Sequence, residues 1–166
     1  MSLPVIETIA KHIICRLENI QLKNGYAFNV AAVELLTRDA DTYTPVPLSI
    51  VVDLVDETEN EAHSCPGNPP AVAYDAQFMV HGYSRQLDRD DDLSNVHYGV
   101  TRHQMQAAIQ KAVTTPVAGD WVTWESNALT SSMTSKTKFE APGHDGVTFS
   151  LLVTYRTDED DPTVKR

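Results

Sequence analysis

Two pairs of histidine and cysteine are the residues of this sequence whose side chains could together hold a metal ion. His12-x-x-Cys15 and His63-x-Cys65 offer the nitrogen and sulfur ligands that Zn²⁺ prefers. The first pair falls about one helical turn apart and the second lies in a loop, which is not the spacing of a zinc finger or a zinc ribbon. We therefore interpret the four as unrelated surface residues and predict that the protein needs no metal and no cofactor.

Carboxylates are the second possible source of chemistry, and they are concentrated in three tracts. The formal net charge is -10, and more than half of the 23 acids belong to these tracts: Asp56, Glu57, Glu59, Glu61; Asp88, Asp90, Asp91, Asp92; Asp158, Glu159, Asp160, Asp161. The tract "DRDDDLSN" lacks the glycine and the terminal glutamate of a calcium-binding loop. We interpret all three as solvated negative surface, which argues against a protein that grips nucleic acid through its phosphates.

No catalytic motif accompanies these residues. The sequence has no G-x-S-x-G, no glycine-rich phosphate loop and no H-E-x-x-H. Four further histidines are scattered over different predicted elements and form no local constellation: His81, His97, His103 and His144. We therefore predict that the protein is not an enzyme and that it acts through its shape and surface.

The elements are organised around a strand from Val147 to Thr157. In "VTFSLLVTYRT", five apolar residues alternate with mostly polar ones, which is the period of a strand with one buried face, and this predicts a place inside the sheet. Four acids and Pro162 follow and cannot continue a strand ladder. We expect residues 1–157 to form a single domain and residues 158–166 to form an extended acidic arm.

The remaining periodicities predict a helix over residues 3–23, strands at Phe28–Leu36 and Leu48–Val55 joined by a long hairpin loop, and a loop from Asp56 to Pro70. A third strand at residues 72–85, a helix from Arg102 to the residue before Pro116, and a strand at residues 128–140 follow. The predicted fold is α+β, with a mainly antiparallel sheet of about five strands and two helices on one face. Cys15 should lie on the polar face of the first helix, where it could belong to a subunit contact.

Length and composition agree with one domain, since 166 residues can bury a sizeable core without disulfide bonds. Two cysteines give no disulfide framework and fit a reducing cytosol. No segment approaches the roughly 18 apolar residues of a membrane span. We expect a protein that is made and kept soluble in a cytoplasm, with no membrane partner.

The order of elements and two short motifs carry a family resemblance. A capped N-terminal helix that ends in "NGY", three strands, a second helix and the closing "VTYRTDEDDP" resemble the tail terminator (tail completion) proteins of long-tailed bacteriophages. The resemblance implies a homohexameric ring in the neck region of the virion. Such a ring caps the tail tube, meets a head-side neck or head completion protein, and lets DNA pass without specific binding.

Three exposed segments are the candidate contacts of such a ring. They are the loop around Asp39 to Thr44, the loop from Asp56 to Pro70, and the tail after Arg156. Their candidate interface residues are Asp39, Asp41, Tyr43, Asp56, Glu57, Glu59, Glu61, Arg156, Asp158, Glu159, Asp160 and Asp161, together with Cys15. The alternatives are another neck or tube-associated virion subunit and, from a different class, a monomeric enzyme or ligand-binding domain.

Overall fold

The computed structural model of the protein describes residues 4–36, 46, 48–67, 70–86, 100, 102–114, 128–141 and 144–164. Along the chain these form the helix α1 (Val5–Glu18), the short 3-10 helix η1 (Leu22–Asn24), and the strands β1 (Ala32–Leu35), β2 (Ser49–Glu59) and β3 (Ala71–Gln86). The helix α2 (Arg102–Thr114) and the strands β4 (Ala128–Ala141) and β5 (His144–Asp158) complete the order. The α+β class and the order of helix, three strands, helix and two strands are confirmed.

The strands form one sheet in the order β1-β2-β3-β5-β4. β5 therefore lies between β3 and β4, as its alternating pattern predicts. The side chains of Phe149, Leu151 and Val153 are each no more than 2% exposed. The pairs β2/β3, β3/β5 and β5/β4 are antiparallel, whereas β1 and β2 are parallel. The sheet is mixed for that reason.

The parallel pair corrects the prediction of a hairpin between the first two strands. Ala32 lies opposite Ser49 and Leu35 lies opposite Val52, so both strands run the same way. A parallel pair needs a connection of about a dozen residues, and the segment between Leu35 and Ser49 is long enough to return to the starting end. Phe28 is buried in the core but precedes the strand, which is shorter than expected.

β2 is longer than predicted, and the loop expected from Asp56 to Pro70 therefore begins later. The strand passes a bulge between Leu54 and Asp56 and then continues, so that Glu57 lies opposite Ala76 and Glu59 lies opposite Tyr74. The exposed edge of a sheet tolerates charged side chains, which is why Asp56, Glu57 and Glu59 do not end this strand.

The first helix is shorter than the predicted residues 3–23, whereas the second begins at the predicted Arg102 and ends at Thr114, one residue before the predicted end. α1 ends at Glu18, and the turn that follows is closed by Gly25 in a left-handed conformation with φ of 79°. Neither helix is long and apolar enough to cross a membrane, within the described part of the chain.

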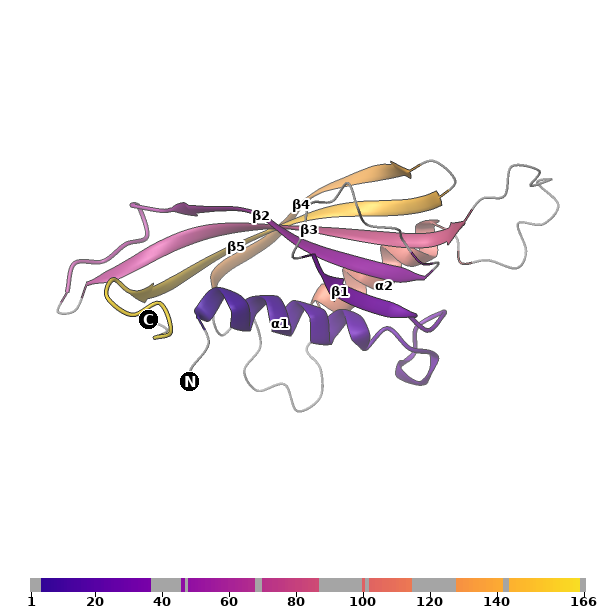
Figure 1. Ribbon diagram of the computed structural model, residues 1–166, viewed down its shortest axis with the longest axis horizontal. Helices are drawn as coiled ribbons and strands as arrows, with labels where there is room; N and C mark the ends of the chain where they lie inside the picture. Colours follow the sequence, from indigo (N-terminus) through magenta and orange to yellow (C-terminus); the bar gives the residue numbers. More distant parts are fainter. Residues whose placement is uncertain are drawn as a thin grey trace.

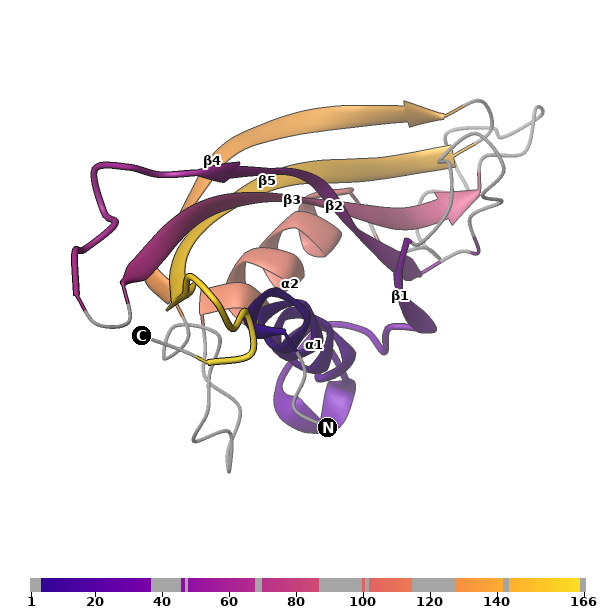
Figure 2. The ribbon, with the colours of Figure 1, turned by 60° about the vertical axis from the view of Figure 1, so that its left-hand side comes forward.

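Both helices pack on the same face of the sheet, and Figures 1 and 2 show them side by side beneath it. Their apolar stripes meet the sheet as predicted, with Ile9, Ile13, Leu17, Met105 and Ile109 all buried. Gly82 on β3 lets α2 approach closely, because a Cβ there would lie 2.6 Å from Cδ1 of Ile109 and 2.8 Å from Cγ of Met105.

One charged side chain lies inside this helical layer. Arg16 of α1 has no exposed surface, and its Nη1 donates to the carbonyl oxygen of Val113 at 2.6 Å. Val113 is in the last turn of α2, where carbonyl groups lack helical partners and the helix dipole favours a cation. The arginine therefore joins the two helices.

The C-terminal segment differs from the predicted extended arm. Asp158 is the last residue of β5 and is only 8% exposed. The chain then turns back, with the amide of Asp158 donating to the carbonyl of Val164 at 3.2 Å and the amide of Val5 donating to the carbonyl of Pro162 at 3.0 Å. The tail thus caps the first turn of α1, and Figure 2 shows it beside the start of that helix.

Candidate functional site

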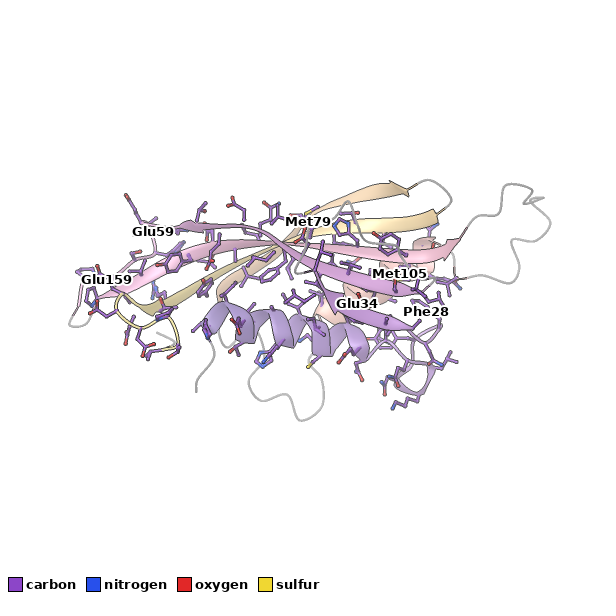
Figure 3. All side chains as sticks on the ribbon, in the orientation of Figure 1. Phe28, Glu34, Glu59, Met79, Met105 and Glu159 are labelled. Atoms are coloured by element: carbon purple, nitrogen blue, oxygen red, sulfur yellow. The ribbon has the colours of Figure 1, made fainter. Side chains whose placement is uncertain are left out.

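The pairing of β2, β3 and β5 brings two of the three acidic tracts to one end of the sheet. The end of β2 lies against the start of β3, which in turn lies against the end of β5. Figure 3 shows Glu59 and Glu159 at this end, far from Phe28 at the other. We call this region the acidic end, and its carboxylates are Asp56, Glu57, Glu59, Glu61, Asp158, Glu159, Asp160 and Asp161.

The loop after β2 is fastened to the same end by hydrogen bonds. The amide of Glu159 donates to the carbonyl of Pro70 at 3.0 Å, and Nε of Arg156 donates to the carbonyl of His63 at 2.7 Å. Cys65 forms an isolated bridge with Ala71. Two of the predicted contact segments, the loop and the tail, are therefore parts of one surface.

A pair of tyrosines lies on the helix side of this end. Tyr74 of β3 and Tyr155 of β5 are opposite each other in register, and their rings stack with centroids 5.6 Å apart and an angle of 27° between the planes. Tyr155 is 3% exposed, whereas Tyr74 is half-buried. Stacked rings of this kind present electron-rich faces that can attract a cation.

Glu57 links the tyrosines to the edge of the sheet. Its carboxylate accepts a hydrogen bond from the hydroxyl of Tyr155 across the intervening strand β3. Burial raises the pKa of Tyr155 well above its usual range, and the hydrogen bond to Glu57 and the charge of Glu57 raise this pKa further. Tyr155 therefore stays protonated and acts as a donor, while Glu57 itself is exposed.

These side chains form one wall of a pocket of about 360 Å³. Glu57, Tyr74, Tyr155 and Thr157 line it from the sheet, Pro4 and Ile6 line it from the start of α1, and Pro162 lines it from the C-terminal segment. We call this cavity the tyrosine pocket. The hydrogen bond from the amide of Val5 to the carbonyl of Pro162 holds together the wall from α1 and the wall from the C-terminal segment.

The remaining predicted residues do not join this site. Cys15 is exposed on α1, as predicted from the helical pattern. No group of three or more histidine, cysteine or acidic residues could hold a metal ion among the described residues, which include His12, Cys15, His63 and Cys65. Asp39, Asp41 and Tyr43 lie outside the described residues, as does the tract from Asp88 to Asp92.

The opposite face of the sheet holds polar pairs that no motif of the sequence indicates. Nδ1 of His81 lies 3.0 Å from Oγ1 of Thr148, and burial lowers the pKa of this histidine, with Asp53 acting in the opposite direction. Thr154 donates to Oδ1 of Asp75 at 2.6 Å, next to the buried core strand. The even-numbered residues of β5 hint at these pairs, because they are mostly polar, and Thr148, Ser150 and Thr154 are all buried in the structure.

A scan against protein-family models finds no match to this chain, and a search of curated proteins finds none either.

Proposed function

We propose that this protein is a structural subunit of a long-tailed bacteriophage that acts as a tail terminator. Copies of the chain form a ring, expected to be a hexamer, that caps the tail tube and joins it to a head-side neck or head completion protein. The resemblance in element order and in the closing "VTYRTDEDDP" supports the family. The structural observation that carries the proposal is the pair of unlike edges of the sheet.

One edge is the second half of β2. The parallel partner β1 covers only Ser49 to Val52, and no other described strand pairs with the outer side of β2 beyond that point. The amide of Glu57 on this stretch donates to Oδ1 of its neighbour Asp56 at 2.9 Å. Leu54 and Val55 are 36% and 54% exposed on this stretch. A strand whose outer side is unpaired and which exposes apolar residues is a template for another chain.

The other edge is β4, at the far side of the sheet. It pairs with β5 along its 14 residues, and no strand in the described ranges lies beyond it. Its sequence contains Lys136 and Lys138 and a single acid, Glu140, whereas residues 53–59 of β2 contain four acids. The two edges are therefore of opposite charge, which favours their association between copies.

Contact between two different edges is heterologous, so each added copy leaves one edge of each kind available. Such contacts close into a ring when the rotation between copies allows it. In the sheet, β4 and β2 run in opposite directions, so β4 of one copy would extend the sheet of the next in an antiparallel sense. Six copies are the number that the family resemblance implies.

The charge of the protein fits a ring around DNA. With a net charge of -10, the surface repels phosphates and lets a duplex pass without being gripped.

Sedimentation of the purified protein over a wide range of concentrations tests the ring. We expect a species whose mass is six times that of the chain, and rings in electron micrographs of the same fractions. A protein that remains monomeric at the highest concentration would contradict the proposal. It would favour the alternative of a monomeric ligand-binding domain, to which the tyrosine pocket would then belong.

A ring alone would not separate a terminator from another neck or tube-associated subunit. The two differ in what the ring binds, because a terminator binds the end of a tail tube. Capture of the purified ring by tube ends, seen in micrographs, favours the terminator, and attachment along the tube wall or to heads alone favours the other subunit.

A further inference from the structure

The tyrosine pocket has the chemistry of a receptor for a positively charged side chain. Glu57 supplies a carboxylate at its rim, and Tyr74 and Tyr155 supply two stacked aromatic rings. We infer that this pocket binds an arginine or lysine side chain carried by a partner protein. This inference does not depend on the ring, since it requires only that a basic segment of another protein meets the acidic end.

The carboxylate of Glu57 has hydrogen-bond acceptor positions left for such a ligand. A carboxylate offers about four acceptor positions, and the hydroxyl of Tyr155 occupies one of those of Glu57. Tyr155 is its side-chain partner within the described part of the chain, where no cation lies against it. An arginine could donate to the remaining positions in the two-pronged geometry that guanidinium and carboxylate groups share.

The two tyrosine rings also attract a cation, in addition to the carboxylate of Glu57. A cation within about 6 Å of an aromatic centroid is attracted by the electron density of the ring face. The hydroxyl of Tyr155 stays protonated and fixed on Glu57, so that the carboxylate and the ring are held in one arrangement before the ligand arrives. Preorganised groups lose less entropy on binding than mobile ones.

The size and the surroundings of the pocket define the ligand further. A volume of about 360 Å³ is at the small end of ligand pockets and suits one long side chain. The walls made by Pro4, Ile6 and Pro162 are apolar and suit the methylene stem of arginine or lysine. The carboxylates of the acidic end repel anions, and they also disfavour a free amino acid, whose own carboxylate would enter with the side chain.

The test uses short peptides with blocked ends and the full-length protein. One peptide, acetyl-Gly-Arg-Gly-amide, contains arginine, and its matched control contains citrulline, which has the same shape without the charge. Binding is followed by the NMR shifts of the tyrosine ring signals, assigned with Tyr74→Phe and Tyr155→Phe variants. We expect the arginine peptide to shift the signals of both rings in a saturable way and the citrulline peptide to bind at least about fivefold more weakly.

A pair of matched variants separates the pocket from the general negative field. Glu57→Gln removes the carboxylate in the pocket and keeps an acceptor for Tyr155, whereas Glu59→Gln removes the same charge from the same strand outside the pocket lining. We expect Glu57→Gln to weaken binding by about five- to tenfold and Glu59→Gln to weaken it by less than about twofold.

Three results would overturn the inference. They are the absence of saturable shifts with the arginine peptide, equal binding of the citrulline peptide, and equal losses in Glu57→Gln and Glu59→Gln. Binding of free arginine as tightly as the peptide would identify a small-molecule site and would contradict a protein-borne ligand. None of these results bears on ring formation, which sedimentation measures separately.

Discussion

The hydroxyl of Tyr155 donates a hydrogen bond to the carboxylate of Glu57, and this bond spans from β5 to β2 across the strand between them. It ties the second half of β2, whose outer side pairs with no described strand, to the centre of the sheet. The same bond fixes one wall of the tyrosine pocket. The edge proposed for ring contacts and the pocket proposed for a basic side chain are therefore mechanically connected.

Replacing Tyr155 by phenylalanine should remove this connection and change how stability depends on pH. At pH 8 the variant should lose about 1 kcal/mol in the free energy of unfolding, the size of one hydrogen bond to a charged group near the surface. The pKa of Tyr155 is raised in the folded protein above the 10.0 that is usual for tyrosine. Its contribution is fully present below pH 10 and decreases as the pH rises further, because the unfolded chain releases this proton first.

Denaturant unfolding of both proteins at pH 8 and pH 10.5 measures the effect. The native protein should lose more stability between these values than the Tyr155→Phe variant, since other titrating groups are common to both. Equal losses in the two proteins would show that the phenol does not resist ionisation in the fold.

Replacing Leu151 by alanine should destabilise the protein by about 2–5 kcal/mol, because the side chain is 2% exposed in the central strand. Leu152→Ala is the matched control, since the neighbouring leucine is half-buried on the other face of the same strand. Its cost in the free energy of unfolding should be clearly smaller. Equal costs in the two variants would argue against a one-sided core.

Replacing Arg16 by leucine should leave the carbonyl of Val113 without its buried donor. We expect a loss of about 1–3 kcal/mol in the free energy of unfolding, measured by thermal or denaturant melts. Lys11→Leu removes the same charge from the exposed face of the same helix and should change stability by less than about 0.5 kcal/mol. A variant at Arg16 that is as stable as the native protein would mean that the arginine does not hold the two helices together.

Replacing Val55 by lysine should prevent ring formation while the monomer stays folded. The side chain is 54% exposed on the half of β2 whose outer side pairs with no described strand, so the monomer loses little. A lysine there adds positive charge to an edge that is proposed to meet β4, whose sequence contains two lysines and one acid. Leu22→Lys is the control, because Leu22 is 58% exposed on η1, away from both edges. Rings of normal mass in the Val55→Lys variant would place the subunit contact elsewhere.

The parts of the fold that follow from local pattern could be predicted from the sequence. α2 lies within one residue of the predicted bounds because a capping box and a stripe from Met105 to Val113 determine it within one segment. The place of β5 inside the sheet can be predicted because its alternation extends over eleven residues.

The parts that depend on distant residues could not be predicted in this way. The direction of β1 relative to β2 depends on the path of the connection and not on the pattern of either strand. Glu57 and Tyr155 meet only because β3 pairs with both β2 and β5. The sequence of either strand by itself therefore does not reveal the pocket. The four acids after Thr157 suggested a solvated arm, but the carbonyl of Pro162 satisfies the first turn of α1 and brings the chain back.

The proposed position of this chain, at the head-side end of a phage tail tube, tests the central claim most directly. Cryo-electron microscopy of particles that carry the protein, with copies identified by gold labelling of a tag, measures both its neighbours and its number. We expect one ring of six copies between the end of the tail tube and the head-side neck protein, with the acidic ends in contact with a basic segment of a neighbour. Copies spread along the tube or copies within the head would contradict the assignment as a tail terminator.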